Sequence, residues 1–376
     1  MTPGQATEPL RYGFTTGACA AAAAKGAALM LREQQIVDAV EINLPIGRPA
    51  TFRLHGQQLT ATGASCYVIK DAGDDPDVTN GAEIHAAIEV EFSAPQRLIL
   101  QGGQGVGRVT KPGLAVQVGD WAINPVPRSM IMEGVTEVLA MRRIPATFTI
   151  TVSIPNGKEL ARKTLNERLG IIGGLSILGT TGIVKPISTK AWTDTLDCAI
   201  DVALASGSGT VVLSTGRTSE LVAQKYLGIG DQTLWGLKGP GTGNSITEES
   251  YVMMGDHVGY ALRACQSKGV QEVILAGQFA KLLKIACGHE QTHASSAELD
   301  LQSLARWCAL EPSISNLESP SRHANSARQV LEDSGNDAVL IALVCGNAAD
   351  AAKKMVPGLA VRVLLAGYNG EVLYFA

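Results

Sequence analysis

The segment from Lys70 to Gly81 holds the densest group of chemically capable side chains in this sequence. It reads KDAGDDPDVTNG, with four aspartates within seven residues. Glycine and proline favour turns over regular secondary structure, so the segment is predicted to be a loop. Its carboxylates repel one another unless a cation or a hydrogen-bond donor lies among them. Two interpretations stay open: a loop that binds a ligand, including a divalent ion such as magnesium or calcium, and a solvated acidic turn with Asx caps.

A second segment, Gly13 to Ala27, reads GFTTGACAAAAAKGA and is predicted to begin a helix. Thr15 or Thr16 can accept a hydrogen bond from the free N–H groups of the first turn, and alanine has the highest helix propensity. Gly17 would let a ligand approach the backbone. Such a helix start can bind a carboxylate or a phosphate. An ordinary capped and buried helix is the alternative.

The residues His289 to His293 read HEQTH and match the H-E-x-x-H pattern of zinc metalloproteases, with Glu290 in the place of the base. That chemistry needs both histidines on one face of a continuous helix and a third ligand, for which Glu298 and Glu311 are the nearby carboxylates. Gly288 is expected to end the preceding helix, which would leave HEQTH in a loop. The pattern therefore favours a loop over a zinc site.

Composition and charge exclude several classes of protein. The length of 376 residues suggests two domains, and the net charge of -4 comes without a basic stripe, so no DNA or RNA partner is expected. The sequence has no signal peptide and no apolar stretch long enough for a bilayer, which predicts a cytoplasmic protein without a membrane partner. Seven cysteines without a C-x-x-C pair indicate neither a disulfide framework nor a thiolate zinc site. Cys19, near the predicted helix start, is the cysteine whose thiolate could be stabilised.

Hydrophobic patterning changes near Pro186 and predicts two domains, 1–185 and 186–376. The first is expected to be α+β, with the alanine-rich helix, a helix near 128–141 and an antiparallel sheet. Its predicted strands alternate apolar and polar residues at 40–45, 51–56, 87–92 and 147–155. The second is expected to be a Rossmann-like α/β domain with a mainly parallel sheet. Its short apolar strands are predicted at 210–214, 272–277, 338–344 and 361–366, and 311–325 is interpreted as a surface connection.

Two connections in the second domain, 214–228 and 276–288, pass from a strand through a glycine into a helix. They would place free N–H groups at the carboxyl edge of the sheet, where ligands bind in open α/β folds. The glycine clusters at 102–107 and 239–244 do not complete a nucleotide-binding loop. The signature of the common class I methyltransferase fold, an acidic residue followed by a G-x-G run after a first strand, is absent.

The acidic segment 70–81 and the segment 13–27, together with further segments, resemble the cobalt-precorrin-5B C1-methyltransferase family (CbiD family) of the anaerobic cobalamin pathway. The resemblance runs from about Tyr12 to His293 and includes AINPVPRSMI (122–131), TLNERLGIIGGLSILGTTGIVKP (164–186), GNSI (243–246) and AGQFAKLLKIACG (276–288), followed by Thr292 and His293. It implies methyl transfer from S-adenosylmethionine to ring carbon 1 of cobalt-precorrin-5B, giving cobalt-precorrin-6A, with cobalt carried by the substrate. Three positions depart from the family pattern: Ala18 stands for a usual threonine, Gln278 for a common histidine and Ala294 for a serine.

The resemblance and the residue chemistry together assign candidate roles. Carboxylates and glycine turns suit S-adenosylmethionine: Asp71, Asp74, Asp77, Asn80, Thr215, Gly216 and Gly277. Cations and hydroxyls suit the acetate and propionate arms of the tetrapyrrole: Thr15, Thr16, Gly17, Lys25, Arg128, Thr180, Thr181, Lys185, Arg217 and Lys281. His293 is the candidate for proton handling or carboxylate contact, with a buried structural histidine as the alternative. Asp75 is the second catalytic candidate.

Three function classes follow from these observations. The methyltransferase is preferred, and a sulfonium methyl is already activated, so the protein mainly has to align the two reactants and exclude water. The alternatives are an H-E-x-x-H zinc hydrolase and a tetrapyrrole-binding protein without chemistry. A homodimer and transient contacts with neighbouring pathway enzymes stay open.

Overall fold

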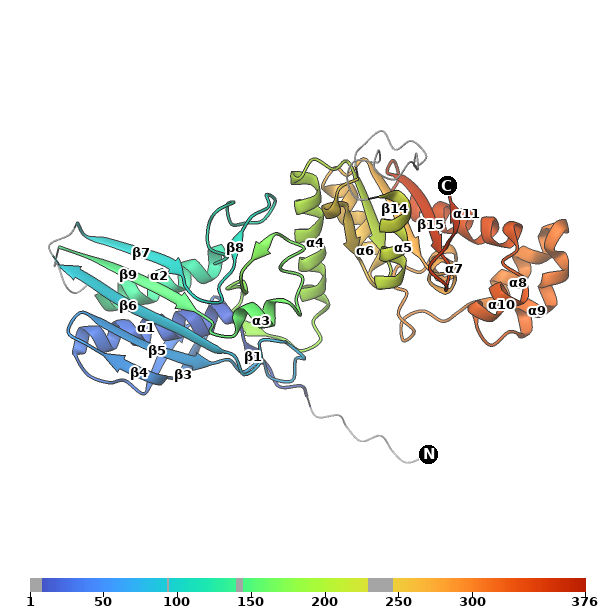
Figure 1. Cartoon of the computed structure of the whole chain (residues 1–376). Coiled ribbons are helices and arrows are strands. Elements are labelled where there is room, and N and C mark those ends of the chain that lie inside the picture. Colours follow the sequence, from blue (N-terminus) through green and yellow to red (C-terminus); the bar gives the residue numbers. More distant parts are fainter. Residues whose placement is uncertain (1–8, 93–94, 140–144, 229–245) are drawn as a thin grey trace, which may run out of the picture. The chain divides into compact units, whose positions relative to one another are not determined.

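The chain divides into two compact units shortly after Pro186. This computed structural model describes residues 9–92, 95–139, 145–228 and 246–376. One unit spans Met1–Ser188 and the other spans Thr189–Ala376. The junction therefore lies close to the boundary that the hydrophobic pattern predicts. Figure 1 labels the elements of each unit.

A five-stranded sheet forms the framework of the first unit (Figure 1). Its order is β4-β5-β6-β9-β7, and the neighbours are antiparallel except for β7 and β9, which are parallel. Buried residues alternate with more exposed ones along β5 and β6, so one face of the sheet points to the core. The predicted antiparallel sheet is confirmed, with a parallel pair at one edge. The strands are β4 (His55–Leu59), β5 (Gly63–Ile69), β6 (Glu83–Phe92), β7 (Arg97–Gly102) and β9 (Ala146–Ser153).

Two helices, α1 (Thr16–Glu33) and α2 (Pro125–Leu139), pack against the sheet and against each other. α1 is buried on nearly all sides, because its alanines have side chains small enough to let β5, β6 and α2 approach. At Gly26 a Cβ atom would lie only 2.4 Å from a methyl carbon of Leu54. Both helices were predicted, although α2 begins earlier than expected, with a proline in its first turn.

Short elements complete the first unit and gather the ends of its chain. β1 (Gly13–Phe14) pairs with β11 (Ile183–Val184), which brings the start of α1 beside the end of the unit. The other short elements are the hairpin β2 (Ala39–Asn43) and β3 (Pro49–Arg53), the pair β8 (Arg108–Val109) and β10 (Ile171–Ile172), and α3 (Gly157–Ala161).

The second unit is built on a sheet of order β13-β12-β14-β15-β16, in which the first four strands are parallel and β16 is antiparallel. This confirms the predicted mainly parallel sheet. The central strands β12 and β14 are almost fully buried, as expected when helices cover both faces. The strands are β12 (Thr210–Ser214), β13 (Tyr251–Met253), β14 (Glu272–Gly277), β15 (Ala360–Ala366) and β16 (Val372–Phe375).

The helices of this unit lie on opposite sides of the sheet. The core around α5 (Arg217–Leu227) is separate from the larger core formed with α4 (Thr189–Ala205), α6 (Val258–Ser267) and α7 (Phe279–Ala286). The connection after β12 therefore turns to one face, and the connection after β14 turns to the other. In open α/β sheets this reversal marks the topological switch point, where ligands bind.

The apolar run 338–344, predicted to be a strand, is instead the start of helix α11 (Ala338–Met355). Asp337 caps the helix, because its carboxylate accepts hydrogen bonds from the N–H groups of Val339 and Leu340 at 2.8 and 3.0 Å. The buried positions of α11 recur with the helical period over the whole length of 338–355. The strand prediction is wrong, because the seven residues 338–344 are too few to reveal the helical period.

The segment 311–325, interpreted from its serines and prolines as a surface connection, contains two helices. Pro312 stands at the start of a 3-10 helix, where a missing N–H costs nothing. The remaining helical elements of the unit are η2 (Glu248–Ser250), α8 (Leu301–Leu310), η3 (Pro312–Leu317), α9 (Glu318–His323) and α10 (Ala327–Asp333).

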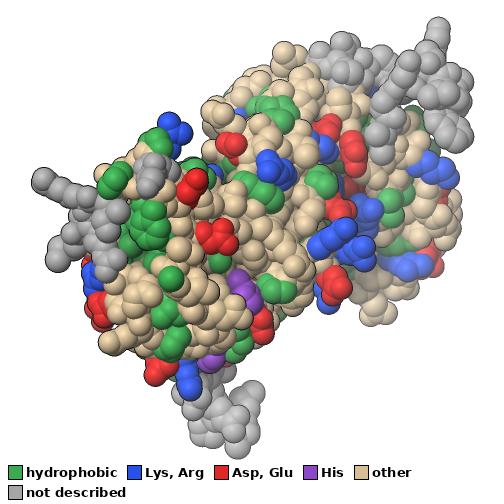
Figure 2. Space-filling view, turned by 60° about the vertical axis from the view of Figure 1, so that its left-hand side comes forward, with side chains coloured by type: hydrophobic (Ala, Val, Ile, Leu, Met, Phe, Trp, Pro, Cys, Tyr) green, Lys and Arg blue, Asp and Glu red, His purple; other side chains and the backbone are tan. Residues whose placement is uncertain are grey.

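The surface carries mixed charge. On the face drawn in Figure 2, acidic and basic side chains are interspersed. Within the described ranges, no helix combines the length and the apolar character that crossing a bilayer requires.

Gly105 tests the packing that supports the start of α1. Its φ is +72°, and a Cβ atom there would lie 1.8 Å from the carbonyl oxygen of Ile154. Its own carbonyl accepts the N–H of Leu175 at 2.9 Å. Leu175 belongs to the segment whose backbone contacts the start of α1. We expect Gly105→Ala to lower the free energy of unfolding by roughly 2–4 kcal/mol, because the side chain adds both a clash and backbone strain.

The matched control is Gly119→Ala, since Gly119 also has a positive φ, +93°, but meets nothing within 4 Å of a Cβ position. Urea unfolding followed by tryptophan fluorescence measures both variants. Equal losses of stability would show that the contact with Ile154 has no special weight.

Candidate functional site

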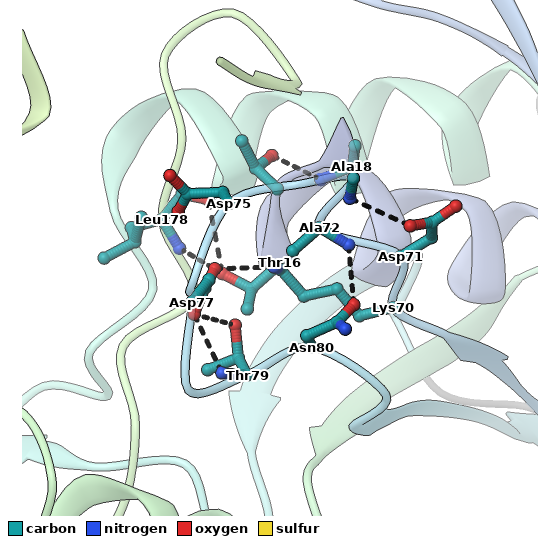
Figure 3. A network of polar contacts seen from close by, with 12 residues as sticks. Thr16, Ala18, Lys70, Asp71, Ala72, Asp75, Asp77, Thr79, Asn80 and Leu178 are labelled. Atoms are coloured by element: carbon teal, nitrogen blue, oxygen red, sulfur yellow. Dashed lines mark hydrogen bonds and ion pairs between the residues drawn. The ribbon is translucent and has the colours of Figure 1, made fainter. Parts of the chain in front are cut away.

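The acidic loop, residues 71–82, joins β5 to β6 and is held from inside by Lys70 (Figure 3). The Lys70 side chain is only 1% exposed, and its Nζ donates to Asp77 Oδ2 at 2.6 Å. The other carboxylate oxygen of Asp77 accepts the N–H and the hydroxyl of Thr79 at 2.8 and 2.7 Å. Burial raises the pKa of Asp77, but the hydrogen bonds from Lys70 and Thr79 outweigh it and leave the pKa below its usual value.

The other three aspartates of the loop have internal donors as well. Asp71 pairs with the Arg11 guanidinium, whose hydrogen bond lowers the pKa of that carboxyl, and Asp74 accepts the Arg11 N–H at 2.6 Å. Asp75 accepts the N–H of Ile187 at 2.9 Å. Asn80 accepts the N–H of Ala72, also at 2.9 Å. The donors that the crowded carboxylates require are thus supplied by the protein.

These contacts support the interpretation of the segment as a turn with Asx caps. Across the described part of the chain, no three His, Cys, Asp or Glu side chains are grouped as metal ligands, so the divalent-ion interpretation gains no support. The assignment of Asp71, Asp74, Asp77 and Asn80 to a cofactor, and of Asp75 to catalysis, stays a prediction.

The start of α1 is capped and covered. Thr15 Oγ1 accepts the N–H of Ala18 at 3.2 Å, and the N–H of Gly17 donates to the carbonyl of Leu178 at 3.0 Å. Thr16 Oγ1 in turn accepts the N–H of Leu178 at 3.0 Å. A Cβ atom at Gly17 would lie 2.6 Å from Pro127. The expectation that Gly17 leaves the backbone open to a ligand is therefore wrong, because the segment around Leu178 occupies that space.

Two further expectations for this region can be compared with the structure. Cys19 is a small buried side chain, and burial raises the pKa of its thiol to about 12, so the thiolate that its place near the helix start allowed gains no support. Lys25 lines a cavity of about 540 Å³ between α1, β2 and α2, where its Nζ pairs with Glu137 at 2.9 Å. Arg128 is half-buried on α2.

The hydroxyls and the lysine near the end of the first unit are on its surface. Thr180, Thr181 and Lys185 are exposed. Thr181 Oγ1 accepts the N–H of Ile183 at 3.2 Å, so it also shapes the local turn. The substrate roles of these residues, and those of Thr15, Thr16, Lys25 and Arg128, stay predictions.

In the second unit, the three residues predicted from the glycine turns meet at the switch point. The N–H of Thr215, which follows β12, donates to the carbonyl of Ala276 in β14 at 3.0 Å. A Cβ atom at Gly277 would lie 3.3 Å from the methyl group of Thr215, whereas one at Gly216 would meet none of the described residues within 4 Å. Gly216 precedes α5, whose first N–H groups face the same edge. The sheet edge therefore presents open backbone beside Gly216.

A polar cluster lies at the same edge, around Asp256 in the turn between β13 and α6. Asp256 Oδ1 accepts hydrogen bonds from Lys281 Nζ and from the Thr292 hydroxyl, the latter at 2.6 Å. Burial raises the pKa of Asp256, but the hydrogen bonds from Lys281 and Thr292, together with the charge of Lys281, leave it lowered. Lys281 was predicted. Asp256 was missed, although its place directly after a strand and a glycine is the signal that found Thr215.

His293 lies at the rim of this cluster. It is exposed, and its Nδ1 shares a hydrogen bond with Ser295 Oγ at 2.8 Å, so the buried structural alternative is wrong. Its proton-handling role stays a prediction. Arg217, also predicted for the substrate, is exposed at the start of α5 and reaches Glu220 at 3.3 Å.

The HEQTH segment lacks the helix that zinc chemistry requires. α7 ends at Ala286, Gly288 has a φ of +87°, and 289–293 form no helix, as predicted. Glu290, in the place of a catalytic base, instead pairs with Arg263 at 2.7 Å. The zinc hydrolase alternative has no support from this geometry.

With an open and mainly parallel sheet whose connections reverse direction between β12 and β14, the second unit places the chain in the doubly wound α/β class, in which ligands bind at the carboxyl edge. The profile of the family described as CbiD matches residues 4–186, and that of the CbiD C-terminal domain matches residues 291–376. The chain belongs to the CbiD family.

Relatives of known name span the chain almost completely. A protein of Geobacter metallireducens is 64% identical over 373 residues, covering 98% of this chain and 99% of the relative. A protein of Citrifermentans bemidjiense is 61% identical, covering 97% and 98%. Both are named cobalt-precorrin-5B C(1)-methyltransferase. A solved structure of a cobalamin biosynthesis protein (cbiD) from Archaeoglobus fulgidus is 30% identical, with a TM-score of 0.39, covering 75% of this chain and 81% of that one.

The Lys70–Asp77 pair should be strongly stabilising relative to its broken form. We expect Asp77→Asn to lower the free energy of unfolding by roughly 3–5 kcal/mol at pH 7, because it leaves the Lys70 ammonium buried without an anion. The folded-state pKa of Asp77 is lowered, so this stability is present above the unfolded pKa of about 3.9 and is lost as the pH falls through the folded pKa. Urea unfolding at pH 7 and near pH 3 measures both effects.

The control is the double variant Lys70→Met with Asp77→Leu, which removes both charges and fills the space with apolar side chains. It should lose less stability than Asp77→Asn alone. A double variant that is the least stable of the three proteins would contradict this account of the pair.

Proposed function

We propose that this chain transfers the methyl group of S-adenosylmethionine to ring carbon 1 of cobalt-precorrin-5B, giving cobalt-precorrin-6A in the anaerobic cobalamin pathway. The observation that carries the proposal is the near-complete match to relatives with that name, 64% identical over 98% of this chain in the first case. Cobalt enters with the substrate and not as a resident cofactor of the protein. The cytoplasm is the proposed compartment, and a homodimer or a transient contact with a neighbouring pathway enzyme is compatible with the proposal.

For the methyl donor we propose the carboxyl edge of the second unit, at Thr215, Gly216 and Gly277. The open backbone at Gly216 and the N–H groups at the start of α5 support this choice, because hydroxyls and carboxylates of a ligand need such donors. The aspartates of the acidic loop are retained as candidate contacts to the donor only where their internal hydrogen bonds leave oxygens available. Their established contacts give them a role in fixing the loop.

For the tetrapyrrole we propose contacts between its carboxylate arms and cationic side chains of the protein. In the second unit Lys281 and Arg217 lie at the sheet edge, and exposed His293 is available to touch a carboxylate or to move a proton. The chemistry demands little more, since the sulfonium methyl leaves by in-line displacement once the ring carbon is aligned behind it. The residues therefore bind, orient and exclude water.

Anaerobic incubation of the full chain with S-adenosylmethionine and cobalt-precorrin-5B tests the proposal. We expect release of S-adenosylhomocysteine together with the gain of one methyl group, located at ring carbon 1 by mass spectrometry and NMR. The boiled protein is the control for spontaneous transfer. Intact substrate without a methyl gain would contradict the methyltransferase and favour the tetrapyrrole-binding alternative.

Gly216→Val tests the donor site separately. The φ of Gly216 is 175°, an extended value that any residue adopts, and no described residue lies within 4 Å of its Cβ position, so the fold should tolerate valine. We expect the Kd for S-adenosylmethionine to rise at least about tenfold, because the side chain enters the space proposed for the ligand. Isothermal titration calorimetry measures it.

Gly346→Val is the matched control, since Gly346 on α11 is also free of neighbours within 4 Å but lies away from the proposed turn residues in the sequence. It should bind the donor like the original protein. Unchanged binding by Gly216→Val would move the donor away from this edge.

A further inference from the structure

Lys284 is a buried cation with which no described carboxylate forms an ion pair. It lies on α7, is nine-tenths buried, and its Nζ donates to the carbonyl oxygen of Thr292 at 3.0 Å. An ammonium group has three N–H donors. Within the described residues, this carbonyl is the acceptor found for Lys284, and no carboxylate forms an ion pair with it. Two of its donors therefore have no protein acceptor there.

A second lysine converges on the same oxygen. Lys281, one helical turn earlier on α7, donates to the Thr292 carbonyl at 3.2 Å and also pairs with Asp256. Two ammonium groups thus share one carboxylate and one carbonyl, which leaves a local excess of positive charge. The other nearby carboxylate in this loop, Glu290, is taken by Arg263.

The charge balance around Lys284 has a cost for the fold. Burial lowers the pKa of Lys284 and the neighbouring Lys281 lowers it further, while Asp256 only partly opposes them. A buried charge with so few partners destabilises the folded state. Ligand binding is one reason for a protein to retain such a charge. The cluster is open toward solvent on one side, because the side chains of Lys281 and Asp256 are 32% and 26% exposed. An anion can therefore reach it.

We infer that Lys281 and Lys284 form a carboxylate-binding subsite, which receives one acetate or propionate arm of the tetrapyrrole. A carboxylate placed beside the Thr292 carbonyl accepts the unused N–H groups of both lysines and neutralises the excess charge. Asp256 and Thr292 act as positioning residues, because Asp256 pairs with Lys281 and the Thr292 carbonyl accepts one N–H from each lysine, which leaves two donors of Lys284 unused. This inference rests on the proposed function for the identity of the ligand and on the geometry for the site itself.

Binding of uroporphyrin, an octacarboxylate tetrapyrrole, tests the subsite without requiring methyl transfer. The full chain is titrated by fluorescence at low salt, with uroporphyrin octamethyl ester as the uncharged probe. We expect Lys284→Met and Lys281→Met each to weaken uroporphyrin binding about tenfold, the effect of one lost charge-assisted hydrogen-bonding group. Lys353→Met, at an exposed lysine in the last turn of α11, should change nothing. Equal binding by Lys284→Met and the original chain, or no binding of uroporphyrin by the original chain, would overturn the inference.

Thermal stability separates a binding lysine from a structural one. Without ligand, Lys284→Met should keep or raise the Tm, because it removes a poorly compensated buried charge. Uroporphyrin should raise the Tm of the original chain more than that of the variant. A Tm several degrees lower in ligand-free Lys284→Met would assign the lysine to the fold and overturn the subsite.

The same variants distinguish this inference from the proposed function. Loss of uroporphyrin binding in Lys284→Met, in a protein that transfers no methyl group, would support the subsite and contradict the methyltransferase. Methyl transfer at the original rate by Lys284→Met, with unchanged uroporphyrin binding, would support the methyltransferase and contradict the subsite. Weaker binding of S-adenosylhomocysteine alone would assign the lysine to the carboxylate of the donor and overturn its assignment to the tetrapyrrole.

Discussion

The buried ion pair between Lys70 and Asp77 is the interaction on which the closure of the first unit depends. An ammonium group that is almost fully enclosed must have an anion, and the loop that supplies it is thereby fixed in place. Once the loop is fixed, its other carboxylates are presented to Arg11 on one side and to the N–H of Ile187 on the other. A single requirement for charge compensation thus ties together the beginning and the end of the unit.

The second unit obeys a different constraint, which comes from backbone geometry. Parallel strands end at one edge, and the connections after β12 and β14 leave that edge in opposite directions, which is the arrangement that forms a binding crevice in open α/β sheets. Thr215, Gly216 and Asp256 are at that edge because each lies within three residues of the end of β12 or β13. Side chains there can combine donors and charges without disturbing the core. The polar residues of the first unit therefore hold its two ends together, whereas those of the second unit lie at a sheet edge that a ligand can reach.

Much of this could be predicted wherever the deciding forces are local. The start of α1 follows from Thr15 and the alanines, and the edge residues follow from a strand, a glycine and a helix in succession. The strand predicted at 338–344 failed because the helical period extends beyond the short window, and because the cap at Asp337 was not weighed.

Other features depend on tertiary contacts that no local pattern contains. Gly17 appears available in the sequence, but Leu178 and Pro127 fill the space beside it. The crowded carboxylates of the acidic loop suggest a ligand in the sequence, but in the fold Arg11, 60 positions before Asp71, and Ile187, 112 positions after Asp75, supply the donors. Whether Lys284 is buried, and which acceptors reach it, likewise depends on the tertiary fold. Sequence patterns identified the chemically capable segments better than they identified what those segments contact.

The hydrogen bond between Thr16 and Leu178 has a consequence for biosynthesis, because the two residues are separated by 162 positions. A ribosome makes α1 early, yet the backbone that covers its first turn emerges only near the end of the first unit. Until then the nascent alanine-rich helix exposes a surface suited to burial, which is the kind of surface that chaperones bind. The first unit is then complete before most of the second has been translated, so the order of synthesis matches the order in which each unit obtains its partners.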